Sequence, residues 1–196
     1  QIACFLILHR RSWMKIFDHL DKMYEDICES DWDDVETKYR ELTLKLAGTK
    51  IVREIDAIDI DDYEKSIMQT LYEAVETAEK ASAGAIYFEY DMDNNWQGCF
   101  YICPAYYREE EEDEDWATDY DEEIEGPDLP AYADIYNEYG GAGGNKAEIG
   151  TTLYLIARTV CAFWRCVEQL PSTPALAICI GYHGQDYIWR IREMEE

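Results

Sequence analysis

The chain has 196 residues, 47% of them hydrophobic and 14% aromatic, which is enough apolar material for one folded core. Its 43 acidic and 17 basic residues give a formal net charge of −26. Such a charge repels phosphate backbones and anionic membranes. It therefore excludes direct binding to nucleic acid or membrane and favours a basic protein as the partner.

The cysteines show neither the spacing of a metal site nor that of a disulfide framework. There are seven of them, an odd number, and no Cys-x-x-Cys pair occurs in the chain. This usage predicts reduced thiols and a cytoplasmic protein without a metal site.

The first residues differ from the rest of the chain. Residues 1–13 contain an apolar run that is too short to span a bilayer, and their basic residues lie on the wrong side of it for a secretory signal. Met14-Lys15-Ile16 reads like a natural start. We therefore expect residues 1–13 to be a non-native or upstream extension, and residues 14–196 to form a single domain.

The first half of the chain shows helical periodicity. Apolar residues recur at helical spacing over 16–27 and again over 35–46, with Ser30 or Asp31 as the cap of the second helix. A further helix is expected from Asp61 to about residue 78. The run between these helices, 51–60, suits a helix by its spacing but is rich in β-branched residues, so both structures stay open there.

The periodicity then changes to two. Residues 85–91 and 96–103 alternate between apolar and polar side chains, and the turn-forming residues Asp93-Asn94-Asn95 separate them. This pattern predicts a β-hairpin.

The last part of the chain combines helices and strands. A short helix is expected over 129–139 and a long, largely apolar helix over 148–170, followed by strands over 175–180 and 187–192. The expected fold class is therefore α+β: an antiparallel sheet of about four strands packed with the N-terminal helices and the long, buried C-terminal helix.

An acidic tract lies between the hairpin and this last part. Twelve of the 17 residues from Glu109 to Glu125 are acidic and none is basic, while Trp116, Tyr120 and Ile124 recur at a spacing of four. Acid with periodic aromatic residues indicates a surface that either docks on its own fold or is offered to a basic partner. Because blocks of like charge are usually solvated, a plain surface loop is the alternative.

We interpret the tract as the main contact region for a partner, since binding energy concentrates in Trp and Tyr while surrounding charge sets the association rate. The predicted partner-binding residues are Glu109, Glu110, Glu111, Glu112, Asp113, Glu114, Asp115, Trp116, Asp119, Tyr120, Asp121, Glu122, Glu123 and Glu125.

No motif predicts catalysis or a cofactor. The glycine cluster 140–144 precedes a helix, but it lacks the residues of a phosphate-binding loop and reads as a hinge. Residues 91–97 resemble half of a calcium loop, yet Trp96 stands where that loop requires Gly. His183 reads as a turn residue. Because no nucleophile with a base is evident, we expect a protein that is not an enzyme and binds no cofactor.

In general character the chain is similar to the acidic immunity proteins of bacterial polymorphic-toxin and interbacterial competition systems. The shared points are a small α+β domain, a heavy negative charge and the lack of a catalytic signature. The resemblance implies tight binding to a basic cognate toxin domain and occlusion of its active site. Two alternatives stay open: a nucleic-acid mimic that inhibits DNA-binding enzymes, and a non-catalytic interaction module.

Overall fold

The computed structural model describes residues 2–111, 115–141, 144–171, 175–184 and 187–194, with side chains from residue 16 onward. Contacts divide the chain into two compact units. One comprises Gln1–Asp59 with Pro130–Cys161, and the other comprises Ile60–Leu129 with Ala162–Glu196.

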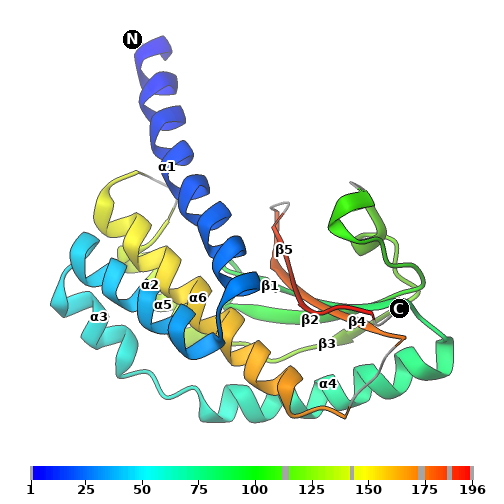
Figure 1. Ribbon diagram of the computed structural model, residues 1–196. Helices are drawn as coiled ribbons and strands as arrows, with labels where there is room; N and C mark the ends of the chain where they lie inside the picture. The colour runs from blue at the N-terminus through cyan, green and yellow to red at the C-terminus, as the bar shows by residue number, and fades with distance from the viewer. Residues whose placement is uncertain (1, 112–114, 142–143, 172–174, 185–186, 195–196) are drawn as a thin grey trace. The chain divides into compact units, whose positions relative to one another are not determined.

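The first unit is helical (Figure 1). Its elements are α1 (Ile2–Glu29), α2 (Trp32–Leu46), α3 (Thr49–Asp56), α5 (Pro130–Tyr139) and the first part of α6 (Lys146–Glu168). The Asp31 carboxylate accepts a hydrogen bond of 2.9 Å from the backbone N–H of Asp34, which confirms Asp31 as the cap of the second helix. The ambiguous run 51–60 is helical only as far as Asp56, in α3, where Ile51, Val52 and Ile55 are buried.

Within this unit, α2 and α6 approach each other closely. Thr43 donates a hydrogen bond of 2.7 Å to the carbonyl oxygen of Gly150, and a Cβ on Gly150 would lie 2.8 Å from the Cβ of Leu46. Arg158 of α6 donates to the carbonyl oxygen of Ile55 at 2.6 Å in a buried position. Gly150 therefore allows α2 and α6 to approach closely, and the buried guanidinium of Arg158 links α6 to α3.

The second unit contains α4 (Asp61–Ala81), the later part of α6 and a sheet. The described strands are β1 (Ala85–Asp91), β2 (Gln97–Cys103), β3 (Glu122–Glu125), β4 (Ala177–Tyr182) and β5 (Ile188–Arg192). They are ordered β3-β2-β1-β4-β5, with β1 and β4 parallel and the other pairs antiparallel.

This sheet confirms the α+β class and corrects two details. The described residues form five strands where about four were expected, because the end of the acidic tract pairs with β2 as β3. The sheet is mixed where an antiparallel one was expected, because the long connection through α5 and α6 returns the chain beside β1 in the same direction.

Alternation along the strands gives the sheet two faces with different surroundings. On one face Phe88 stacks on Phe163 of α6 with ring centroids 5.1 Å apart, and Phe100 lies 4.6 Å from Phe88. Helix α4 packs against β1, β2 and β3, and it buries Ile67 and Leu71. The opposite face of β1, β2 and β3, which carries Glu89, is called the open face below. In Figure 1 the short turns η1 (Glu109–Glu111) and η2 (Asp115–Ala117) of the tract lie on the side of the sheet away from α4.

Gly98 allows the aromatic packing beneath β2. A Cβ at this position would lie 2.4 Å from the ring of Phe88. We expect Gly98→Ala to lower the free energy of unfolding by about 1–3 kcal/mol, as overpacked cores do, in a chemical denaturation experiment. The same substitution should cost less in a Phe88→Leu background, where the neighbouring ring is absent. Equal costs in both backgrounds would contradict the packing explanation.

Candidate binding site on the open face of the sheet

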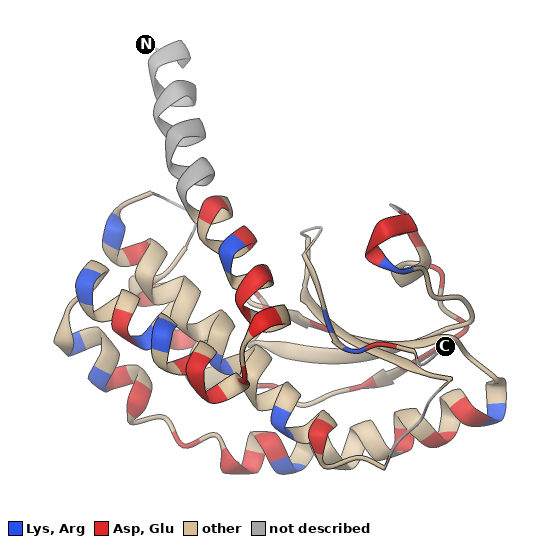
Figure 2. Ribbon diagram, in the orientation of Figure 1, with Lys and Arg blue, Asp and Glu red and all other residues tan. Residues whose placement is uncertain are grey.

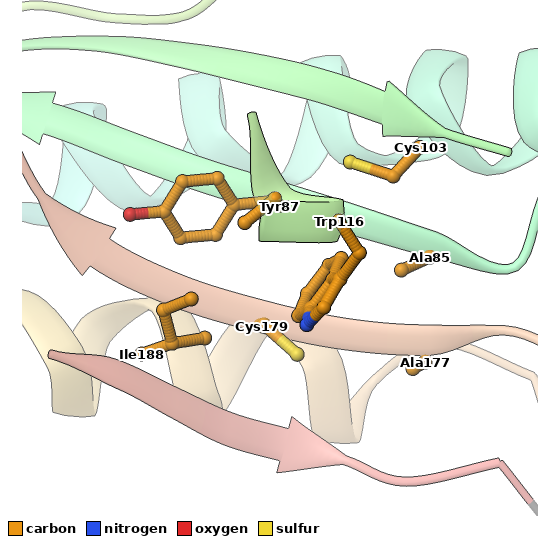
Figure 3. Packing of buried hydrophobic residues seen from close by; sticks show 8 residues of the cluster. Ala85, Tyr87, Cys103, Trp116, Ala177, Cys179 and Ile188 are labelled. Atoms are coloured by element: carbon orange, nitrogen blue, oxygen red, sulfur yellow. The ribbon is translucent and has the colours of Figure 1, made fainter. Parts of the chain in front are cut away.

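The acidic tract docks on the open face through Trp116. This residue lies in a short 3-10 turn, η2 (Asp115–Ala117), and only 2% of it is exposed. Its indole packs edge-on against Tyr87 and Tyr106, with ring centroids 6.4 and 5.1 Å away. Figure 3 shows the indole above β1 and β4, between Cys103 and Cys179. The sequence left open whether the aromatic residues of the tract dock on the fold or are offered to a partner. Trp116 docks on the fold.

The described part of the tract is not a helix, although its aromatic residues recur at helical spacing. It contains the turns η1 (Glu109–Glu111) and η2 and then strand β3. Acidic residues cover the η1 turn in Figure 2. Tyr120 remains 43% exposed and lies against Tyr101, with ring centroids 4.5 Å apart. The spacing of four reflects separate contacts with the sheet instead of one helical face.

A cavity of about 560 Å³ lies on the open face, over β1, β2 and β3. Its carboxylates come from Glu89 and Asp91 of β1 and from Glu123 and Glu125 of β3. The registers Glu89↔Cys99↔Glu125 place three of the lining residues in one row across the strands. Because these side chains project from paired strands, the sheet fixes the spacing at which they leave the backbone.

A second cavity of about 420 Å³ shares part of this lining. Glu89, Tyr101 and His183 line both cavities. The second cavity adds aromatic and acidic side chains of the tract, including Tyr120 and Asp115. Neither lining contains a Lys or an Arg among the described residues. We call the two cavities together the acidic groove.

The groove contains one basic side chain, and it is paired. Nδ1 of His183 lies 3.0 Å from a carboxylate oxygen of Glu89. The hydrogen bond and charge of Glu89 raise the pKa of His183 above its ordinary value of 6.5, and Asp91 and Asp93 act in the same direction. The described lining of the groove is therefore acidic, and its one basic side chain, His183, holds a proton more firmly than a free imidazole does.

Titration of His183 gives a first prediction about the groove. Because its pKa is raised in the fold, the contact with Glu89 contributes to stability below about pH 6.5, and this contribution is lost as the pH rises through the raised pKa. An NMR titration should place the imidazole pKa above 6.5, and Glu89→Gln should bring it down towards that value. Glu109→Gln, on η1, should leave it unchanged. A pKa at or below 6.5 in the unaltered protein would contradict the pairing.

The tyrosine side chains that line the groove are protonated. Burial and the neighbouring Glu89 raise the pKa of Tyr87 well above 10. The pKa of Tyr120 is raised mainly by the charge of Glu123. These hydroxyls therefore act as hydrogen-bond donors beside carboxylates and add no further negative charge.

The thiol of Cys99 lines the first cavity of the groove. Burial is the main factor that raises the pKa of the Cys99 thiol, whereas a nucleophilic cysteine needs a lowered pKa. Among the described residues, no group of three or more His, Cys, Asp and Glu side chains is placed to hold a metal ion.

In the part of the chain that the structure describes, no helix combines the length and apolar character that crossing a membrane requires.

The structure divides the predicted partner-binding residues into four groups. Asp115, Tyr120, Glu123 and Glu125 line the acidic groove. Trp116 is buried. Glu109, Glu110, Glu111, Asp119, Asp121 and Glu122 are exposed outside the groove lining. Glu112, Asp113 and Glu114 lie outside the described residues.

Sequence reasoning did not find the other half of the groove. Glu89 and Asp91 alternate with the apolar residues used to predict β1, so the period of two already assigned them to the opposite face. His183 lies in a turn, as predicted, but its contact with Glu89 joins residues 94 positions apart. No local pattern reports such a pairing.

Comparison of the chain with models of protein families, with curated proteins and with solved structures gave no match.

Proposed function

We propose that this protein is an immunity-type inhibitor that binds and neutralises a basic cognate toxin domain through its acidic groove and acidic tract. The observation that carries the proposal is the lining of the groove. Four carboxylates face the two cavities from β1 and β3, and neither lining contains a Lys or an Arg among the described residues. A surface of this kind is complementary to a cationic protein surface.

The rigidity of the groove supports binding over simple solubility. An acidic residue that only improves solubility needs no fixed position. Glu123 and Glu125 are instead held by pairing of β3 with β2, and Gln97 donates a hydrogen bond of 2.9 Å to the Glu125 carboxylate. Carboxylates fixed in this way lose little conformational entropy when a partner binds.

The docked tract defines which aromatic residue a partner can contact. Trp116 is buried against the sheet, whereas the ring of Tyr120 is exposed beside the groove and open to contact. We therefore assign Trp116 the role of anchoring the tract, and Tyr120 the role of contacting the partner. The proposed mode of action needs no cofactor, because occlusion of the toxin's active site is sufficient for inhibition.

The proposal is tested with the basic protein encoded by the gene next to this one. Mixing the two purified proteins should give a stoichiometric complex whose affinity falls as salt is added. The same complex should lack the toxic activity of the partner. A protein that instead competes with DNA for several unrelated DNA-binding proteins would be a nucleic-acid mimic. Failure to bind any basic protein encoded by the neighbouring genes would contradict the proposed function.

A further inference from the structure

The second cavity of the acidic groove is lined by several aromatic rings and by an apolar wall. It is lined by the rings of Tyr87, Tyr101 and Tyr120, and on the apolar side by Ala117 and Ile188. Its volume of about 420 Å³ falls within the range of about 300–1,000 Å³ of small-ligand pockets.

The charges of this cavity are complementary to one cation. Glu89 and Asp115 line it, and Glu89 is only partly exposed. The Glu89 carboxylate already accepts one cationic group, the imidazole of His183 at 3.0 Å. A carboxylate in a partly dry site attracts a cation more strongly than an exposed one does.

The aromatic rings favour a planar cation over a compact one. Tyr101 and Tyr120 both line the cavity, with ring centroids 4.5 Å apart at an interplanar angle of 42°. A guanidinium stacks on such rings and donates paired hydrogen bonds to a carboxylate, whereas an ammonium does neither as well. The methylene groups of an arginine would lie along the apolar wall.

We infer that the second cavity receives the guanidinium of a single arginine side chain of the partner. The guanidinium lies against Tyr101 and Tyr120 and pairs with Glu89, where it replaces His183. This inference rests on the proposed function and specifies the partner residue that occupies the groove. Since a guanidinium and an imidazolium compete for one carboxylate, binding of arginine disfavours the protonated form of His183.

The test is an NMR titration of the full chain at low salt with three probes: N-acetyl-arginine amide, the lysine analogue, and the neutral citrulline analogue. The arginine probe should shift the signals of Tyr101, Tyr120 and His183, more strongly than lysine does, and citrulline should leave them unchanged. The affinity of the arginine probe should fall about tenfold in Tyr120→Ala and in Glu89→Gln. The matched control Glu76→Gln, on α4, should bind the probe normally.

Two results would overturn the inference. One is equal binding of citrulline and arginine, which would remove the role of charge. The other is the absence of shifts at Tyr101 and Tyr120 at tens of millimolar arginine probe. If the basic protein encoded by the neighbouring gene still binds the open face in that case, the arginine pocket is wrong and the proposed function stands. If that protein fails to bind as well, both are wrong.

Discussion

Replacing Trp116 with Ala should lower the free energy of unfolding by about 3–5 kcal/mol, the usual cost of removing a large buried aromatic side chain. The indole is 2% exposed and packs between the rings of Tyr87 and Tyr106. Its Nε1 donates no hydrogen bond to any described residue. Neither variant removes a hydrogen bond. Trp116→Phe should therefore cost clearly less than Trp116→Ala, because Phe removes less of the buried volume. Chemical denaturation with both variants measures the difference.

Cysteine reactivity provides an independent measurement of the same packing. Cys103 lies in the cluster beside Trp116, and burial, more than the nearby Asp119 and Asp121, raises the pKa of its thiol to about 12. In Trp116→Ala this thiol should react faster with an alkylating reagent, while the exposed Cys28 should react at the same rate in both proteins. Tyr120→Ala, an exposed position of the same tract, should change neither stability nor reactivity by much. An unchanged stability of Trp116→Ala would show that the tract does not dock.

Neutralising the acidic groove should weaken partner binding about 100-fold or more, because single buried charge pairs at interfaces are worth about 2–5 kcal/mol when one member is removed. The variant carries four substitutions: Glu89→Gln, Asp91→Asn, Glu123→Gln and Glu125→Gln. At low salt the association rate should also fall about tenfold or more, because steering by the negative field is reduced. Binding kinetics with the partner, measured over a range of salt concentrations, separate the two effects.

A variant with the same change of net charge on another face is the control. Helix α4 lies on the side of the sheet away from the groove, and four of its exposed acidic residues are substituted: Asp62, Glu73, Glu76 and Glu79. Their neutralisation should reduce the association rate slightly and leave the dissociation rate unchanged. If the α4 variant and the groove variant weaken binding equally, net charge is responsible and the groove is not the site. Thermal denaturation of both variants shows whether each is folded.

Local patterns predicted the individual elements well, because their causes are local. The strand expected over residues 85–91 is β1 with the same bounds, and Asp31 caps α2 as the sequence indicated. Each of these elements depends on side chains within a few residues: alternation for the strand and a hydrogen bond to Asp34 for the cap. The helix expected from residue 16 is longer in the structure, where α1 begins at Ile2.

What the sequence did not predict depends on contacts between distant segments. Strand β3 reads Glu-Glu-Ile-Glu, which has little intrinsic tendency to form a strand, and it exists because β2 pairs with it. The parallel pairing of β1 with β4 likewise joins segments about 90 residues apart. The tract was predicted to be the main contact region, and four of the predicted residues line the groove. The rest of the groove needed the positions of Glu89 and His183, which only the fold supplies.

Carboxyl footprinting of the complex shows directly whether the acidic groove captures a basic protein. A carbodiimide labels accessible carboxylates, and mass spectrometry locates the label in the free protein and in its complex with the basic protein encoded by the neighbouring gene. Glu89, Asp91, Glu123 and Glu125 should lose reactivity on binding, while Asp62 and Glu76 on α4, whose side chains are 98% and 68% exposed, should keep theirs. Protection of the α4 carboxylates with undiminished labelling of the groove would contradict the claim.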